Sequence, residues 1–144
     1  MFKDIVEFHT KFKLPGATEP KFLEHPMHMF RCRFMNEELK EFFEASKVGD
    51  LEQAADALVD LAYVVLGTAY LMGIPWDECW AEVHRANMTK ERAVVREDSK
   101  RGSIYDVVKP PEWEPPNLGR ILYANTREAS EVEPPMQTRE GGGE

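Results

Sequence analysis

An apolar run, ADALVDLAYVVLGTAYLMG from Ala55 to Gly73, contains two charged side chains, Asp56 and Asp60. The two aspartates stand one helical turn apart, so they share a face of any helix formed there. An ionised carboxylate without a partner costs several kcal/mol when it is buried. The run therefore predicts a packed helix whose two acids need a cation.

Residues 57–76 have nearly the length of a membrane span. However, Asp60 lies inside this segment and Gly73 and Pro75 close it, which favours a core helix and no membrane partner. At 144 residues the chain is long enough for one domain with its own core. Polar residues near the start, Lys3 and Asp4, come before any apolar segment, so we expect no signal peptide.

Apolar side chains at helical spacing predict four helices, over residues 2–12, 27–48, 50–72 and 75–88. Gly49 and Gly73 suit helix ends, whereas Asp50 and Pro75 suit helix starts. A short strand is indicated only in SIYDVVK, residues 103–109. We therefore expect an all-α fold with a four-helix core.

The composition changes after Lys90, where the chain becomes charged and then rich in proline. Such a segment is typical of an irregular extension that runs over the surface. From about Thr126 onward the sequence contains little that can be buried, so we expect residues 119–144 to form a disordered or loosely docked tail. The predicted domain covers residues 1–118.

The second predicted helix carries acids in NEELKEFFEAS, residues 36–46. Glu37, Glu38 and Glu41 fall within an arc of about 100° that borders the apolar stripe of this helix. A solvated acidic face explains this helix alone equally well. The aspartates of the third helix favour a cation-binding site over a solvated face, because acids from two adjacent helices would then converge.

The neutralising cation is not evident among nearby basic residues, since Lys40 and Lys47 lie on the opposite side of the second helix. An all-oxygen site suits Mg²⁺ or Mn²⁺. A di-iron bundle is not indicated, because no histidine has a glutamate three residues before it. Hard cations held by carboxylates are typical of phosphate chemistry.

Basic and amide groups follow in EVHRANMTKER, residues 82–92, where Arg85, Asn87 and Lys90 could contact a polyphosphate. Cations at a helix C-terminus are also common without any ligand. The net charge of −8 argues against a nucleic-acid polymer as partner. Two distant cysteines, Cys32 and Cys79, favour a reduced, cytoplasmic protein.

Together, EELKE at Glu37–Glu41, Asp60 and the segment HRANMTK resemble the MazG-like all-α nucleoside triphosphate pyrophosphohydrolases, which are similar to phosphoribosyl-ATP pyrophosphohydrolase. The family pattern is E-E-x-x-E on one helix and E-x-x-D on the next. Ala57 stands where the family has its second-helix glutamate, and Asp56 is the nearest substitute. The resemblance covers about residues 5–118.

The resemblance implies hydrolysis of a nucleoside triphosphate by an enzyme that is a homodimer or homotetramer, its four-helix core completed across the interface. It implies Mg²⁺, or Mn²⁺, held by Glu38, Glu41 and Asp60, with Asp56 and Glu37 completing the site. Glu37 or Glu38 would act on the attacking water. The match to the segment HRANMTK implies that Asn87 and Lys90 contact the phosphates or the sugar. Further candidate substrate-binding residues are Arg85, Lys109 and Trp113. Docking of the tail onto the bundle is the alternative role for Trp113.

The substrate is left open between two groups of nucleotides. One is dGTP or GTP in a phage nucleotide pathway, in the cytoplasm of a bacterium or an infected host. The other is dUTP or dCTP, removed by a house-cleaning enzyme. A different hypothesis is that the protein has no catalytic activity and acts as a helical interaction module.

Overall fold

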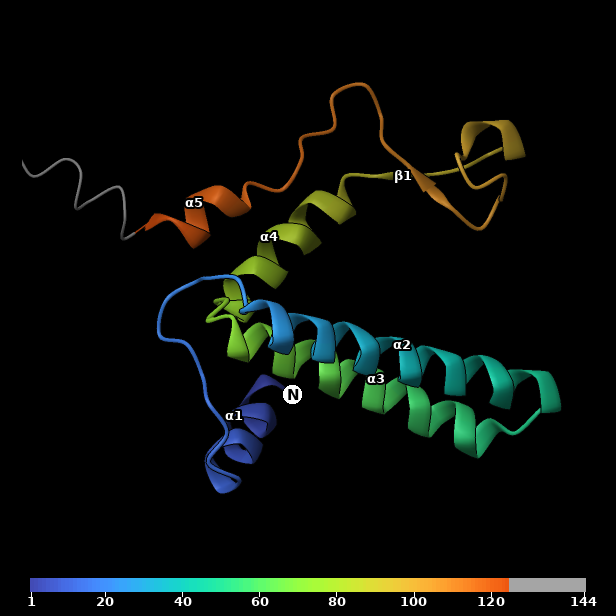
Figure 1. The fold of residues 1–144 in the computed structure, drawn as a ribbon. Helices are drawn as coiled ribbons and strands as arrows, with labels where there is room; N and C mark the ends of the chain where they lie inside the picture. Colours follow the sequence, from blue (N-terminus) through green and yellow to red (C-terminus); the bar gives the residue numbers. More distant parts are fainter. Residues whose placement is uncertain (125–144) are drawn as a thin grey trace, which may run out of the picture.

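The computed structural model describes residues 1–124, which are mainly helical (Figure 1). The main helices are α1 (Phe2–Lys11), α2 (His25–Val48), α3 (Leu51–Leu71) and α4 (Trp76–Met88). The extension contains β1 (Glu91–Arg92), the 3-10 helix η1 (Arg96–Asp98), β2 (Val107–Val108) and α5 (Leu118–Leu122). Strands β1 and β2 pair antiparallel, with Glu91 opposite Val108. The expected all-α fold is confirmed.

The turn between α2 and α3 forms as the local sequence predicts. Gly49 ends α2 with φ 74°, a left-handed conformation that glycine adopts without strain. The side chain of Asp50 then accepts a hydrogen bond of 3.1 Å from the amide of Gln53 and caps α3. At its other end α2 begins two residues earlier than predicted, because Pro26 suits the first turn of a helix.

Helices α2 and α3 lie antiparallel, side by side, along most of their length (Figure 1). The buried residues near the turn are small, namely Ala45, Ala54 and Ala57. Small side chains allow two helix backbones to approach closely. This contact fixes which residues of α2 face which residues of α3.

Helix α1 packs against α3 through Ile5 and His9, which are 1% and 4% exposed. The ring of His9 lies 4.5 Å from the ring of Tyr70, measured between centroids. Phe2 stacks on Trp76 at the start of α4, with centroids 6.4 Å apart. These contacts place α1 beside the C-terminal end of α3.

Helix α4 points away from the α2–α3 pair, so the four helices do not close into a bundle within one chain (Figure 1). Large apolar side chains stay uncovered, including Leu58, Val59 and Trp80, which are 48%, 62% and 61% exposed. Helix α3 is long and apolar enough to cross a membrane, as core helices of soluble proteins often are, yet only 28% of its apolar window is buried. The expectation that this helix is buried on most sides is thus wrong for the single chain.

The C-terminal extension docks on α4 through two hydrogen bonds. The indole Nε1 of Trp113 donates to the carbonyl oxygen of Ala86 at 2.7 Å. The amide of Asn117 donates to Oε1 of Glu82 at 2.8 Å, and Glu82 also pairs with Arg85 at 2.9 Å. Docking is therefore the observed role of Trp113 within one chain. The predicted tail lies largely outside the described residues, although α5 extends past residue 118.

Glu82 makes this docking sensitive to acid. The hydrogen bonds from Arg85 and from the amide of Asn117 lower the pKa of Glu82 from 4.5 to about 2. A lowered pKa means that the carboxylate stabilises the docked state above pH 4.5 and loses this effect as the pH falls towards 2. We expect Glu82→Gln to speed amide hydrogen exchange in residues 113–123 at neutral pH. The matched control is Glu78→Gln, an exposed acid of the same helix; equal exchange in both variants would contradict the role of Glu82.

Candidate active site

Five acids of α2 and α3 form what we call the carboxylate cluster. Its members are Glu37, Glu38 and Glu41 of α2 and Asp56 and Asp60 of α3. The antiparallel packing brings Glu38 and Asp60 to the wall of the same cavity. Glu38 is only 7% exposed, whereas the other four acids are exposed. Glu38 is therefore the most buried member of the cluster.

The electrostatic environment of Glu38 shows that the five acids are close together. Burial raises the pKa of Glu38, and the charges of Glu41, Asp60, Glu37 and Asp56, in decreasing order, raise it further. In residues 1–124 the acids that form ion pairs belong to other parts of the chain, as in the pair of Glu44 with Lys47. The cluster thus concentrates negative charge that the described side chains do not neutralise.

Asp56 lies at the edge of the cluster. Its charge has the smallest effect on the pKa of Glu38 among the four neighbours, and it also borders a shallow depression with Glu52 and Val59. Ala57, at the position of the missing glutamate, is 3% exposed and belongs to the core. Asp56 therefore stays near the other acids, in a more peripheral place.

The chemistry of the cluster fits a hard divalent cation. Its donors are all carboxylate oxygens without ion-pair partners, which Mg²⁺ and Mn²⁺ prefer. The side chains of residues 1–124 do not already include three acids, histidines or cysteines arranged to hold a metal. Rotation of the exposed acids about their side-chain bonds would be needed to bring their oxygens together.

A cavity of about 360 Å³ opens beside Glu38 and Asp60, between α1, α2 and α3. Phe8, Phe34 and Tyr63 supply aromatic surface to its wall. The rings of Phe8 and Tyr63 meet edge to face, with centroids 5.5 Å apart. The acids are thus joined to a pocket with largely aromatic walls, a common form of small-molecule site.

Arg31 also lines this cavity, and the sequence-based search for cations missed it. Its Nε donates to Oγ1 of Thr68 at 2.9 Å and its Nη2 donates to the carbonyl oxygen of Val64 at 2.6 Å. Burial lowers the pKa of the Arg31 guanidinium, which nevertheless stays charged. Arg31 could have been recognised from the sequence, because it precedes Glu38 by seven residues and therefore lies two turns away on the same face of α2.

The five predicted substrate-binding residues gather at the C-terminal end of α4 and in the extension, and we call them the α4 cluster: Arg85, Asn87, Lys90, Lys109 and Trp113. Nζ of Lys90 donates to Oδ1 of Asn87 at 2.8 Å. Nζ of Lys109 lies 4.0 Å from the ring centroid of Trp113. This end of α4 points away from the α2–α3 pair (Figure 1), so one chain does not bring the α4 cluster to the carboxylates.

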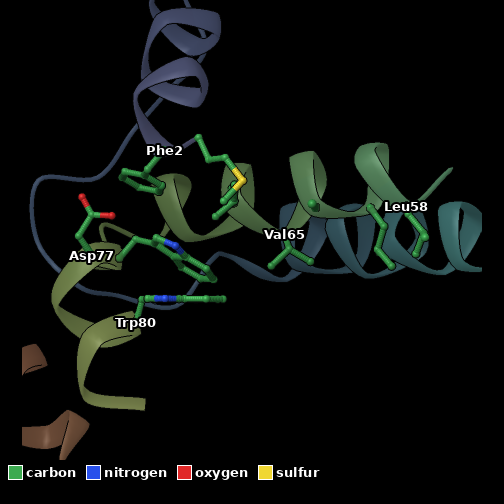
Figure 2. Close-up of a pocket in the computed structure, with 10 residues that line it drawn as sticks. Phe2, Leu58, Val65, Asp77 and Trp80 are labelled. Atoms are coloured by element: carbon green, nitrogen blue, oxygen red, sulfur yellow. The ribbon is translucent and has the colours of Figure 1, made fainter. Parts of the chain in front are cut away.

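An apolar groove of about 540 Å³ runs between α1, α3 and α4 (Figure 2). Leu58 and Val65 of α3 line it together with Phe2 and Trp80, and Asp77 is its one charged side chain. The exposed side chains of Leu58 and Trp80 belong to this groove. A large apolar surface of this kind is typical of an interaction site.

Comparison with protein-family models shows which family the chain resembles. The model of the family described as phosphoribosyl-ATP pyrophosphohydrolase matches residues 5–87, more than half of the chain. This segment contains the whole carboxylate cluster together with Arg85 and Asn87, and it ends before Lys90. The search of curated proteins found no match. The chain belongs to the phosphoribosyl-ATP pyrophosphohydrolase family.

Proposed function

We propose that this protein hydrolyses a nucleoside triphosphate to the monophosphate and pyrophosphate. The observation that carries the proposal is the carboxylate cluster, in which Glu38 is buried among four other acids and has no ion-pair partner within residues 1–124. An arrangement that destabilises a carboxylate in this way is more typical of functional sites than of structural ones. Membership in a pyrophosphohydrolase family supports the reaction class.

The residues that would hold Mg²⁺ or Mn²⁺ are Glu38, Glu41 and Asp60, with Asp56 and Glu37 binding directly or through water. When bound, the cation would neutralise phosphate oxygens and lower the pKa of a coordinated water. Without a cation, the negative charges of these five acids would repel a triphosphate. A cation shared by these acids would therefore allow the acidic cluster to bind an anionic substrate.

Glu38 or Glu37 would accept a proton from the attacking water. The oxygen of the water forms a new bond to phosphorus, the phosphoanhydride bond between the α and β phosphates breaks, and pyrophosphate leaves. Glu38 lies on the cavity wall beside Asp60, which is a suitable position for a group that accepts this proton. Its burial also limits the water that can compete for the same proton.

A homodimer or homotetramer would bring together the carboxylate cluster and the α4 cluster, which lie apart within one chain. The apolar groove and the exposed side of α3 support association, because a partner helix would bury Leu58 and Trp80. In such an assembly the α4 cluster of one copy could reach the carboxylates of another and contact phosphate oxygens through Lys90 and Asn87. We place the protein in the cytoplasm, and its free Cys32 and Cys79 are compatible with a reducing compartment.

The candidate substrates are dGTP or GTP in a phage nucleotide pathway, and dUTP or dCTP in a house-cleaning role. A catalytically silent module is disfavoured, because it would gain nothing from keeping Glu38 buried among other acids. Phosphoribosyl-ATP, the compound in the family description, belongs in the same panel of substrates.

The reaction is tested by incubating the protein with this panel and Mg²⁺ or Mn²⁺ and assaying pyrophosphate. We expect release from at least one triphosphate and a fall in kcat/KM of about 100-fold or more in Glu41→Gln and Asp60→Asn, which remove proposed metal ligands. Glu44→Gln is the control, since Glu44 pairs with Lys47 outside the cluster. Failure to release pyrophosphate from any compound would refute the function, and full activity in both ligand variants would refute the ligand assignment.

The stability of the folded protein tests the cluster without any substrate. A raised pKa means that ionised Glu38 destabilises the fold, an effect that fades as the pH falls through its folded value and vanishes below 4.5. We expect Glu38→Gln to raise the Tm at pH 7 without metal and to lose the gain in Tm that Mg²⁺ gives the native protein. The difference between the two proteins should shrink at acid pH. A metal response preserved in Glu38→Gln would contradict this account.

Association through the apolar groove is tested by Leu58→Glu, which places a charge on its exposed wall. We expect a monomer in sedimentation velocity and a loss of pyrophosphohydrolase activity, because a buried charge disfavours the interface. Val94→Glu is the control, since Val94 is 83% exposed in the extension. An unchanged assembly in Leu58→Glu would show that the groove is not the interface.

A further inference from the structure

We propose that the aromatic cavity beside the carboxylate cluster binds the base of the substrate, and that Arg31 and His9 select bases with a lactam edge. A lactam edge is a ring carbonyl next to a ring N–H, as in guanine, uracil and thymine. This inference rests on the proposed function, because it names the class of nucleotide that the same site would take. It adds two residues, one on α2 and one on α1, that neither the family motif nor the sequence analysis singled out.

The hydrogen bond of His9 determines which nitrogen of its ring can accept. Nδ1 lies 3.2 Å from the carbonyl oxygen of Pro15, and a carbonyl can only accept. Nδ1 therefore carries the hydrogen, and in the neutral ring Nε2 is left as an acceptor. His9 is 4% exposed and lines the cavity, so its ring is held in one orientation and Nε2 is an acceptor at the cavity wall.

Arg31 supplies the complementary donors. Only two of its five N–H groups are used in bonds within residues 1–124, one to Thr68 and one to the backbone of Val64. Both bonds fix the plane of the guanidinium against α3. The remaining N–H groups of Arg31 are donors available to a ligand in the cavity.

Gly67 leaves open the space where the donor and the acceptor meet. A Cβ at this glycine would lie 3.0 Å from Nη2 of Arg31 and 3.4 Å from Nε2 of His9. Both nitrogens thus border one small space at the cavity wall. A glycine at a helix position costs about 1 kcal/mol relative to alanine, so its presence in α3 calls for a local reason, and this open space supplies one.

The pairing of one donor with one acceptor distinguishes the bases. A lactam edge presents an acceptor oxygen beside a donor N–H, which matches the guanidinium of Arg31 and Nε2 of His9. The corresponding edges of adenine and cytosine present an amino donor beside a ring-nitrogen acceptor, so they would place donor against donor. The mismatch leaves buried polar groups unpaired, the situation in which sites discriminate most strongly.

The position of the cavity agrees with a bound nucleotide. Arg31 and Glu38 are seven residues apart on α2, which corresponds to about 10 Å along the helix axis. This separation is on the scale of a nucleoside, so a base held at Arg31 would direct its phosphates towards Glu38 and Asp60. Phe8, Phe34 and Tyr63 would cover the flat surface of the base between these two ends.

The test compares kcat/KM for dGTP, dUTP, dATP and dCTP, together with calorimetric binding of GMP, UMP, AMP and CMP in the absence of metal. We expect the native protein to prefer one or both lactam nucleotides by about 10-fold or more in each assay. Comparison of guanine with uracil shows which of them the cavity takes. Binding preference without hydrolysis would uphold the base site while refuting the proposed reaction.

Two variants test the roles of Arg31 and Gly67. Arg31→Gln should reduce the preference for lactam bases by about 10- to 100-fold, and Gly67→Ala should weaken nucleotide binding by filling the open space while Arg31 is kept. Lys40→Gln, on the exposed side of α2, is the control, and circular dichroism verifies folding. Equal use or binding of all four bases by the native protein, no binding of any, an unchanged preference in folded Arg31→Gln, or unchanged nucleotide binding in folded Gly67→Ala would overturn the inference.

Discussion

The close antiparallel packing of α2 against α3 is the contact on which the site depends. Alanines at 45, 54 and 57 allow the two backbones to approach near the turn, and Gly49 with Asp50 sets the register by ending one helix and starting the next. Because the register is set at the turn, Glu38 and Asp60 reach the same cavity wall. The carboxylate cluster is thus a consequence of helix pairing.

This packing creates an electrostatic cost that the fold alone does not remove. Glu38 is buried and repelled by its four neighbours. Arg31, a cation on the same face of α2, is engaged with Thr68 and the backbone of α3. Stability is therefore lower than an apolar residue at this position would allow. Proteins retain such groups mainly where a ligand relieves the cost, and a shared divalent cation would do so.

The described part of the chain also leaves apolar surface open. The groove beside Trp80 and the uncovered side of α3 face outward, while the C-terminal extension is committed to α4 through Trp113 and Asn117. Up to residue 124 the extension does not cover the groove, so this surface is available to a partner. The same geometry separates the α4 cluster from the carboxylates within one chain, which is why association and catalysis are linked in the proposed enzyme.

The helices were predictable from the sequence, because their signals are local. Periodic apolar residues, Gly49, Asp50 and Pro75 predict the helix boundaries to within about two residues, and the acids were found because helical spacing places them on one face. The roles of the five acids as ligands and bases stay predictions. The folded structure was needed to show how deep each acid lies and that Trp113 docks on α4. It also shows that Arg31, His9 and Gly67 share one cavity with Glu38. Local patterns cannot determine these features, since they depend on which side chains three separate helices bring together and on how much water their packing excludes.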